Sequence, residues 1–286
     1  MSRIVYLDGT YLPETEAKVS IFDRGFLMAD AVYEVTSVLD GRLIDFPGHL
    51  ARLGRSLSEL SIRNPLQDQD WLELHRSLIA RNGMSEGLIY LQVSRGNPGD
   101  RDFAYPAADV APTVVAFTQS KNNLAANPQA ETGLRVISLP DMRWVRRDIK
   151  TVQLLPSSMA KMAAKAAGVD EAWFTEAGLV TEGTSSNVFI LKAGHLITRP
   201  LSQDILHGIT RRAALRLADE AGLVIEERAF SIDEAQAADE AFLTSASSFV
   251  LPVTEIDGIR LGDGKPGPVS RDLRRIYIEE MRRAAM

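Results

Sequence analysis

The chain has 286 residues, of which 45% are hydrophobic and 24% charged, so it is long and apolar enough to fold and global disorder is excluded. The formal net charge is −6 and basic residues form no run of five, which argues against a nucleic-acid-binding protein. The absence of cysteine excludes disulfides, thiolate zinc sites and a cysteine nucleophile. Two basic clusters, Arg143/Arg146/Arg147 and Arg271/Arg274/Arg275, are interleaved with other residue types and predict a solvated surface.

Membrane and metal sites are not expected either. No stretch of 18 apolar residues is present, and the first residues lack the apolar core of a signal peptide, so we expect a cytoplasmic protein without membrane association. The four histidines His49, His75, His195 and His207 show no metal-ligand spacing. We therefore expect no metal site.

Strand and helix patterns alternate in the first third of the chain. The start reads as a strand ending in an Asp8-Gly9 turn, and residues 33–39 and 42–46 read as a hairpin around Asp40-Gly41. Leucines at helical spacing follow at 50–60, and a second helix over 71–79 stops at Asn82-Gly83. Strands are predicted at 88–94 and 113–117, with a Gly- and Pro-containing loop over 96–101 between them.

A polar, turn-rich stretch at residues 119–131 predicts a linker between two domains. Beyond it we expect strands at 134–138, 171–175, 187–191, 195–198, 224–228, 240–244 and 250–256, and helices at 157–167, 209–221 and 269–284. This order predicts an α+β fold with an N-terminal domain over 1–118 and a C-terminal domain over 132–286.

Three segments of the second half carry candidate chemistry. Lys150 lies between apolar neighbours just ahead of a helix, where a lysine can have a lowered pKa and act as a nucleophilic amine. Glu182 is followed by small and polar residues that offer hydroxyl and amide groups to a ligand. Gly208 opens a predicted helix, and helix N-termini bind phosphate.

Each of these signals has an ordinary structural explanation: a surface lysine, a hairpin corner and a plain helix cap. A further cluster, Thr244-Ser245-Ala246-Ser247-Ser248, is equally typical of a turn. Together, however, they supply an amine, an acid and two anion-binding segments, the set that a pyridoxal-phosphate (PLP) enzyme needs.

The residues that support a family assignment occur in order along nearly the whole chain, from about Tyr6 to Gly264. The matching segments are Asp23-Arg24-Gly25, 30–35, 49–53, Arg95-Gly96, 148–150, 181–189, 208–211 and Thr244-Ser245. In these segments the sequence resembles the fold-type IV PLP enzymes, most closely the bacterial D-amino-acid transaminases. The resemblance implies two α+β domains with the cofactor at the domain interface.

The resemblance also implies roles for cofactor-binding residues. Lys150 corresponds to the catalytic lysine that forms a Schiff base with PLP, and Glu182 to the carboxylate at the pyridine nitrogen. Arg52, Ile209 and Thr210 correspond to phosphate ligands, and Leu206 to the apolar support of the ring. The remaining cofactor-binding positions are Ser185, Ser186, Gly208, Ser245 and Ala246; the last is often Thr in the family, so one hydroxyl is lost here.

Substrate residues follow the family less closely. The resemblance implies that Tyr33 and Arg101 bind the substrate carboxylate, with Arg101 lent by the partner subunit of a homodimer. Phe103 stands where the family has a histidine donor, and Ser37 where close relatives tend to have lysine. Val35 and Ser247 complete the implied substrate site.

The implied activity is transamination of D-amino acids such as D-alanine with 2-oxo acids by a ping-pong mechanism. Because of the departures at Phe103 and Ser37, (R)-amine and branched-chain amino-acid transaminases stay as alternatives, and aminodeoxychorismate lyase ranks below them. A protein that binds PLP without catalysis is a further alternative, but retention of Lys150, Glu182 and Arg52 argues against it.

Overall fold

The computed structural model describes residues 2–286, which form two compact units. The first contains the residues up to Asn122 together with 149–153 and 284–286, and the second contains 123–148 and 154–283. The sequence boundaries, 1–118 and 132–286, differ from this division because the short segment around Lys150 and the C-terminal residues pack within the first unit.

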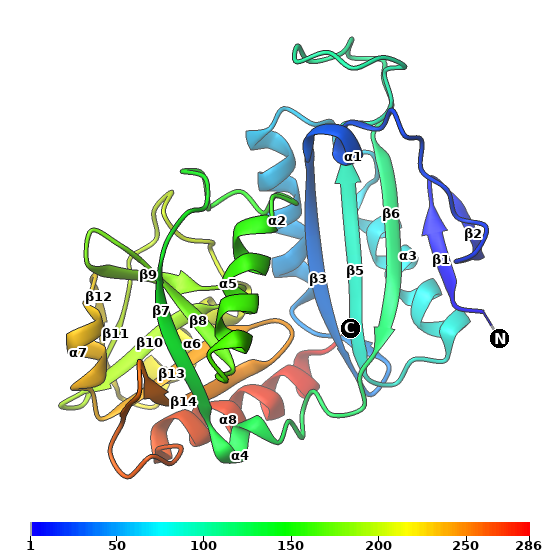
Figure 1. Ribbon diagram of the computed structural model, residues 1–286. Coiled ribbons are helices and arrows are strands. Elements are labelled where there is room, and N and C mark those ends of the chain that lie inside the picture. The colour runs from blue at the N-terminus through cyan, green and yellow to red at the C-terminus, as the bar shows by residue number, and fades with distance from the viewer. Residues whose placement is uncertain (1) are drawn as a thin grey trace. The chain divides into compact units, whose positions relative to one another are not determined.

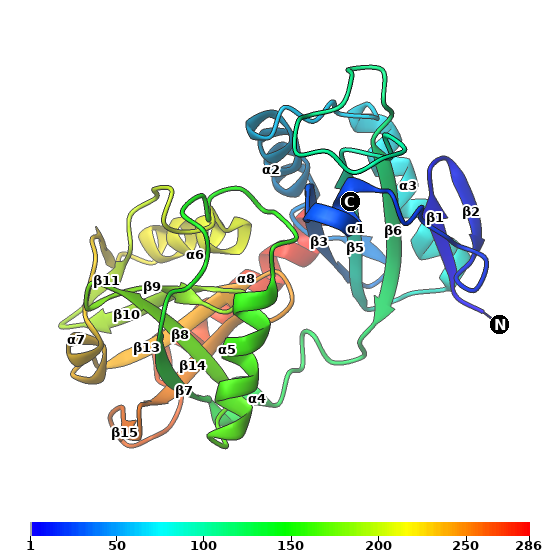
Figure 2. The same cartoon turned by 45° about the horizontal axis from the view of Figure 1, so that its top comes forward.

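The first unit is built on one antiparallel sheet with the strand order β2-β1-β6-β5-β3-β4 (Figure 1). Helices α2 and α3 lie on one side of this sheet, packed against β3, β1 and β6 (Figure 2). The strands are β1 (Ile4–Leu7), β2 (Thr10–Pro13), β3 (Ala31–Leu39), β4 (Arg42–Leu43), β5 (Gly87–Ser94) and β6 (Thr113–Ser120), and the helices are α1 (Arg24–Met28), α2 (Phe46–Glu59) and α3 (Asp68–Asn82).

The second unit is built on a mixed sheet with the order β12-β11-β10-β13-β14-β7-β8-β9, to which β15 adds beside β14. Its core gathers apolar side chains from most of these strands, including Trp173, and from Phe230 in the segment between β12 and α7. The strands are β7 (Leu134–Pro140), β8 (Glu171–Glu176), β9 (Leu179–Gly183), β10 (Asn187–Lys192), β11 (His195–Thr198), β12 (Val224–Glu227), β13 (Glu240–Ser245), β14 (Phe249–Ile256) and β15 (Ile259–Arg260); the helices are α4 (Gln129–Thr132), α5 (Leu155–Ala166), α6 (Ile209–Glu220), α7 (Ile232–Gln236) and α8 (Pro268–Ala284).

The main elements predicted from hydrophobic spacing are confirmed, whereas some local details differ. The strand expected over 42–46 ends at Leu43, because Asp45 adopts a left-handed conformation and helix α2 begins at Phe46 with Pro47 in its first turn. At the ends of the expected linker 119–131, β6 runs to Ser120 and α4 begins at Gln129. The missed strand β9 carries Glu182 on a ladder with β8 rather than on a turn.

The loop between β5 and β6 carries Arg101 and Phe103 and projects beyond the end of the sheet of its unit (Figure 1). Gly96, at its root, has φ +95°, and a Cβ atom added there would lie 1.9 Å from the carbonyl oxygen of Ala111. Glycine is required because the two roots of the loop approach each other backbone to backbone.

Two substitutions distinguish the energetic cost of this close approach from the cost of a left-handed backbone. Gly99 has φ +96°, but an added Cβ would meet no atom within 4 Å. We expect Gly99→Ala to lower the free energy of unfolding by about 1–2 kcal/mol, the cost of a left-handed residue, and Gly96→Ala to cost at least about 1 kcal/mol more from the clash. Urea denaturation of both variants measures the difference; equal losses would contradict the close approach.

Candidate functional site

The predicted site residues fall into two groups, one in each unit. The first unit holds Lys150, Tyr33, Val35, Arg52, Arg101 and Phe103. The second unit holds Glu182, Ser185, Ser186, Leu206, Gly208, Ile209, Thr210, Ser245, Ala246 and Ser247.

Lys150 is attached to the edge of β3. The Tyr33 N–H donates to the Lys150 carbonyl at 2.9 Å, and the Val152 N–H donates to the carbonyl of Ala31 at 3.2 Å. Strand β4 pairs only with the far end of β3, so the first residues of β3 are free to bind this segment. The pairing places the Lys150 Nζ 4.1 Å from the centroid of the Tyr33 ring. A lysine amine and a tyrosine are therefore neighbours through backbone pairing.

The ring of Tyr33 continues into an aromatic ladder across the sheet. Tyr33 stacks on Tyr90 at 5.5 Å, and Tyr90 stacks on Phe117 at 5.0 Å. Because side chains alternate along β3, Val35 lies on the same face as Tyr33, and Glu34 points to the opposite face. The amine of Lys150 therefore lies beside the first ring of this ladder.

Arg52, on α2, is engaged by Glu34. Its Nε donates to Glu34 Oε1 at 2.7 Å and its Nη2 to Oε2 at 2.8 Å, and His49 Nδ1 lies 2.8 Å from Oε2. All three side chains are buried. Burial raises the pKa of the Glu34 carboxyl, but the Arg52 guanidinium and the bond to His49 lower it more, so the pKa lies well below its ordinary value. The ion pair fixes the Arg52 side chain.

Arg101 and Phe103 lie exposed on the loop between β5 and β6. The Arg101 guanidinium carbon lies 4.7 Å from the centroid of the Phe103 ring, within cation–π distance. Phe103 is 78% exposed, which is unusual for so large an apolar side chain.

In the second unit, the buried Asn187 joins three predicted segments. Its Nδ2 donates to Glu182 Oε2 at 3.2 Å and to the Leu206 carbonyl at 2.9 Å, and the residue pairs with Thr244 in the sheet. A Cβ added at Gly208 would lie 2.0 Å from Asn187 Oδ1, so the entry to α6 passes directly against it. Asn187 is not among the predicted site residues, although it lies within the matching segment 181–189.

Glu182 is a buried carboxylate with several donors. The N–H of Leu206 lies 3.0 Å from its Oε2, and Arg143 Nη1 forms an ion pair with its Oε1. Arg143 in turn is held by Asp141 at 2.6 Å. Burial raises the pKa of the Glu182 carboxyl, and the Arg143 guanidinium and the Leu206 N–H counteract that rise.

The prediction that Arg143, Arg146 and Arg147 form a solvated surface is wrong for two of them. The side chains of Arg143 and Arg147 are only 12% and 4% exposed, and both pair with Asp141, which is itself buried. Arg143 also pairs with Glu182, which the sequence could not indicate because that carboxylate is 39 residues away. In the second basic cluster Arg274 is likewise buried, so the prediction is wrong for it too.

Polar groups without protein partners line the same part of the second unit. The buried hydroxyls of Ser186 and Thr244 have no hydrogen-bond partner among residues 2–286. Ile209 and Thr210 open helix α6, whose first N–H groups have no partner within the helix. Ser245 and Ala246 follow Thr244, and Ser247 lies 3.3 Å from Ser245, hydroxyl to hydroxyl. Of the predicted residues here, Ser185 is exposed. These hydroxyl and amide groups are suited to bind a ligand that carries an anionic group and one further polar group.

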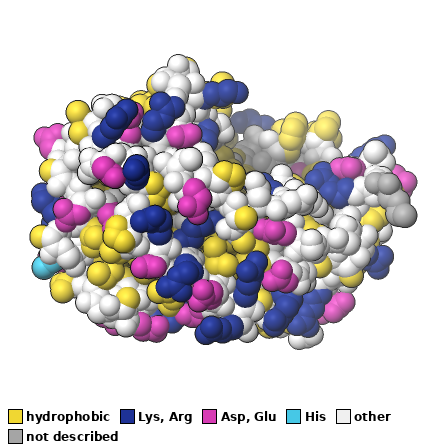
Figure 3. Space-filling view, turned by 90° about the horizontal axis from the view of Figure 1, so that it is seen from below, with side chains coloured by type: hydrophobic (Ala, Val, Ile, Leu, Met, Phe, Trp, Pro, Cys, Tyr) yellow, Lys and Arg dark blue, Asp and Glu magenta, His cyan; other side chains and the backbone are white. Residues whose placement is uncertain are grey.

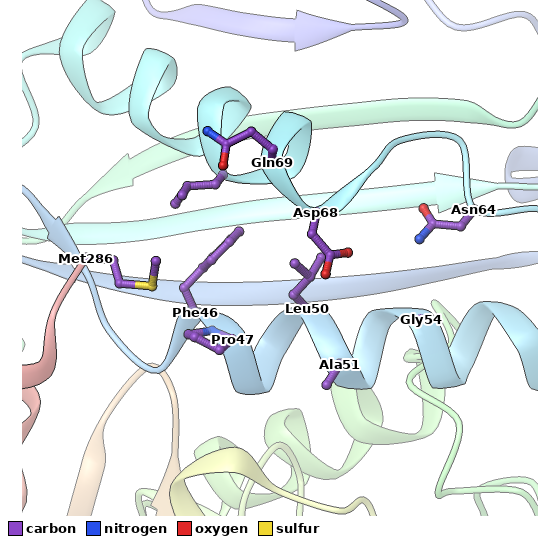
Figure 4. A pocket seen from close by; sticks show the side chains of 10 residues that line it. Phe46, Pro47, Leu50, Ala51, Gly54, Asn64, Asp68, Gln69 and Met286 are labelled. Atoms are coloured by element: carbon purple, nitrogen blue, oxygen red, sulfur yellow. The ribbon is translucent and has the colours of Figure 1, made fainter.

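A cavity of about 430 Å³ lies elsewhere in the first unit, between α2 and the start of α3 (Figure 4). None of the predicted site residues line it. Its walls include Phe46, Leu50, Asp68 and the C-terminal Met286.

Three sequence expectations concern metals, membranes and nucleic acids. No group of His, Cys, Asp or Glu in the described chain could hold a metal ion, and no helix in it is long and apolar enough to cross a bilayer. On the face drawn in Figure 3, Lys and Arg side chains are interspersed with Asp and Glu. The expected cytoplasmic location stays a prediction.

Comparisons with known proteins give one consistent result. The family described as Amino-transferase class IV matches residues 31–256. The D-alanine aminotransferase of Bacillus licheniformis is 39% identical over 269 residues, and that of Staphylococcus aureus (strain MSSA476) is 35% identical; each alignment covers 94% of both chains. Among solved structures, the branched-chain amino acid aminotransferase from Thermobaculum terrenum, in its PLP-form, superposes with a TM-score of 0.85 at 25% identity, covering 98% of this chain and 94% of the other.

The buried Glu34 cluster has a testable pH dependence. Since the pKa of Glu34 is lowered in the folded state, its ionised carboxylate contributes fully to the free energy of unfolding at pH values above the ordinary carboxyl pKa. This contribution is lost as the pH falls from the ordinary pKa through the lower pKa of the folded state. We expect Glu34→Gln to lower the melting temperature at pH 7, by an amount equivalent to about 3–5 kcal/mol for a broken buried pair.

The loss should shrink as the pH falls from 5 towards 3. Glu14→Gln, which removes the exposed Arg3–Glu14 pair, is the control and should change the melting temperature little at any pH. A Glu34→Gln loss that is independent of pH would contradict the lowered pKa.

Proposed function

Because the chain belongs to the class IV aminotransferase family, we propose that it transfers amino groups between D-amino acids such as D-alanine and 2-oxo acids, using PLP. The observation that carries this proposal is the likeness to D-alanine aminotransferases over 94% of both chains, together with Lys150 and Glu182 in the expected segments. The branched-chain aminotransferase structure in its PLP-form supports the fold and the cofactor class.

The donors of the second unit suit the cofactor. The start of α6 at Ile209 and Thr210, with Ser245 and Ala246, would hold the phosphate, which helix N-termini favour. The hydroxyls of Ser186 and Thr244, which have no partner among the described residues, are available to a ligand. Gly208 leaves the backbone accessible where a side chain would collide with Asn187. The proposal assigns Arg52 to the phosphate as well, with Glu34 orienting its guanidinium.

The bound cofactor supplies an aldehyde that accepts amino groups and a ring that withdraws electrons from the substrate Cα. Lys150 would bind the aldehyde covalently and, once displaced by a substrate amine, carry a proton to and from Cα. General acid–base catalysis of this kind needs the free amine near Cα, and the Lys150 Nζ lies beside the Tyr33 ring, 4.1 Å from its centroid. The backbone pairing with β3 keeps the amine in place while it is not attached.

Glu182 would accept a hydrogen bond from the protonated ring nitrogen. A carboxylate at that position favours the protonated ring, which is the better electron acceptor. Arg143 supports this role, because its ion pair favours the ionised form of a carboxyl group that burial would otherwise protonate. Asn187 and the Leu206 N–H restrict the orientation of Glu182.

Substrate recognition is assigned to Tyr33, Val35, Arg101, Phe103 and Ser247. Arginine suits a carboxylate because its planar donors can bind both oxygens. We further propose a homodimer in which the Arg101 loop serves the neighbouring site. Exposed apolar side chains of α5, Leu155 and Met162, support an association surface on the second unit.

A second candidate is transamination of an (R)-amine or a branched-chain amino acid. Such a substrate would not need the second hydrogen-bond donor that the carboxylate site lacks. The observation that favours it is Phe103, which is exposed and cannot donate a hydrogen bond. The proposed D-amino-acid activity and this alternative differ only in the substrate, so one experiment separates them.

The spectrum of the purified protein with PLP tests the proposal directly. We expect a visible absorption band that D-alanine removes, with release of pyruvate, and that L-alanine leaves unchanged. Lys150→Ala should lower the activity by a factor of at least about a thousand, since it removes the covalent and acid–base group. A band that responds to L-leucine or an (R)-amine instead of D-alanine would support the second candidate, and a Lys150→Ala protein of full activity would contradict the assigned role.

The role of Arg101 is tested by substrates with and without a carboxylate. We expect Arg101→Ala to raise KM for D-alanine by about ten- to a hundredfold, the worth of a charge-assisted bond, while KM for a simple (R)-amine changes little. Arg63→Ala, an exposed arginine of the same unit, is the matched control. Equal increases for both substrates would remove Arg101 from carboxylate recognition.

A further inference from the structure

A buried arginine holds the loop that carries Arg101 and Phe103. Arg24 is only 4% exposed, although the loop residues around Phe103 are exposed. Its Nη1 donates to the carbonyl oxygens of Asp102 at 2.6 Å and Ala104 at 3.1 Å. One guanidinium nitrogen thus binds the main chain immediately before and immediately after Phe103.

The same guanidinium is fixed at its other end by a carboxylate. Asp30 Oδ2 accepts from Arg24 Nε at 2.7 Å and from Arg95 Nε at 2.7 Å, and its Oδ1 accepts from Arg95 Nη2 at 3.0 Å. Burial raises the pKa of Asp30, but the bonds from Arg95 and Arg24 lower it more, so the net pKa is below its ordinary value. Asp30 therefore orients both guanidinium groups.

Arg95 extends this arrangement in two directions. Its Nη2 and Nη1 donate to the carbonyls of Leu60 and Ser61, at the end of the helix that carries Arg52, at 2.7 and 3.1 Å. Its guanidinium carbon also lies 3.6 Å from the centroid of the Tyr105 ring. The loop is thus attached at Asp102, Ala104 and Tyr105, and its root is closed by the Gly96–Ala111 approach.

We propose that Arg24, oriented by Asp30, is a positioning residue that orders the 101–105 loop before substrate binds and thereby determines selectivity for carboxylate substrates. The proposal rests on the proposed function, because it assigns Arg101 to the substrate carboxylate. The physical reason is entropic: an exposed loop that is already ordered loses less freedom when its arginine binds the substrate. Without the two carbonyl bonds and the Tyr105 stack, Arg101 would sample many positions.

Two variants weaken the attachment in different ways. Arg24→Lys keeps the positive charge beside Asp30 but has a single nitrogen, which cannot reach both the carboxylate and the two carbonyls. Tyr105→Leu removes the ring beside Arg95 and leaves every buried ion pair intact. Tyr11→Leu is the matched control, because Tyr11 also carries an arginine, Arg81 at 4.4 Å, on β2 rather than on the loop.

The first measurement is amide hydrogen exchange of the variants without substrate. We expect exchange in residues 97–111 to accelerate by about tenfold or more in Arg24→Lys and Tyr105→Leu, a factor that corresponds to about 1.4 kcal/mol. Exchange in β3 and β5 should stay unchanged, and Tyr11→Leu should leave the loop as in the wild type. Unchanged loop exchange in Tyr105→Leu and Arg24→Lys would overturn the ordering role.

The second measurement is steady-state kinetics of the PLP-loaded enzyme. We expect both variants to raise KM for D-alanine by about fivefold or more, the cost of reordering a loop, with kcat within about twofold and KM for an (R)-amine unchanged. Faster loop exchange with an unchanged KM for D-alanine would overturn the role in selectivity. A wild-type protein without aminotransferase activity would refute the proposed function, and the exchange arm would still decide whether Arg24 orders the loop.

Discussion

A carboxylate buried in a protein must be paired with a cation and with hydrogen-bond donors, and three such carboxylates organise the functional parts of this chain. Burying an unpaired carboxylate is so costly that the group would protonate instead, and breaking a buried pair costs about 3–5 kcal/mol. Glu34 binds Arg52, Asp30 binds Arg24 and Arg95, and Glu182 binds Arg143. Each pair fixes one segment that the proposed chemistry needs.

These pairs differ in what they position. The Glu34 pair orients a side chain that is itself assigned to the cofactor, whereas the Asp30 pairs act on the main chain of an exposed loop. The Glu182 pair favours the charged form of the group that would contact the ring nitrogen. In the proposed site, the same physical requirement would thus support phosphate binding, substrate recognition and electron withdrawal in three different ways.

Phe103, which stands where the family has a histidine donor, changes how the loop would bind a carboxylate. A loop with a histidine would present two donors, and this loop presents Arg101 stacked on an apolar ring. If Arg101 binds the substrate carboxylate as proposed, selectivity would then depend more strongly on where the contacts of Arg24 and Tyr105 hold the loop. The family membership is shared with both D-alanine and branched-chain aminotransferases, and this loop is where substrate preference would be set.

The sequence by itself determined the larger helices and strands, because their apolar residues recur at spacings that only one element can bury. It also identified Lys150, Glu182 and Gly208 as candidates, since these lie in short motifs of consecutive residues. It missed β9 and predicted a strand at residues 44–46, where Asp45 in a left-handed conformation and Pro47 override a short apolar run.

Only the tertiary structure decided which charges are paired. Arg143 meets a carboxylate 39 residues away, Arg24 meets carbonyls 78 and 80 residues away, and Lys150 pairs with a strand more than a hundred residues earlier in the chain. Periodicity reports the face of an element that is buried, and it carries no information on which distant element covers that face. The pairing of buried charges depends on which distant element covers the face, and packing in three dimensions decides this.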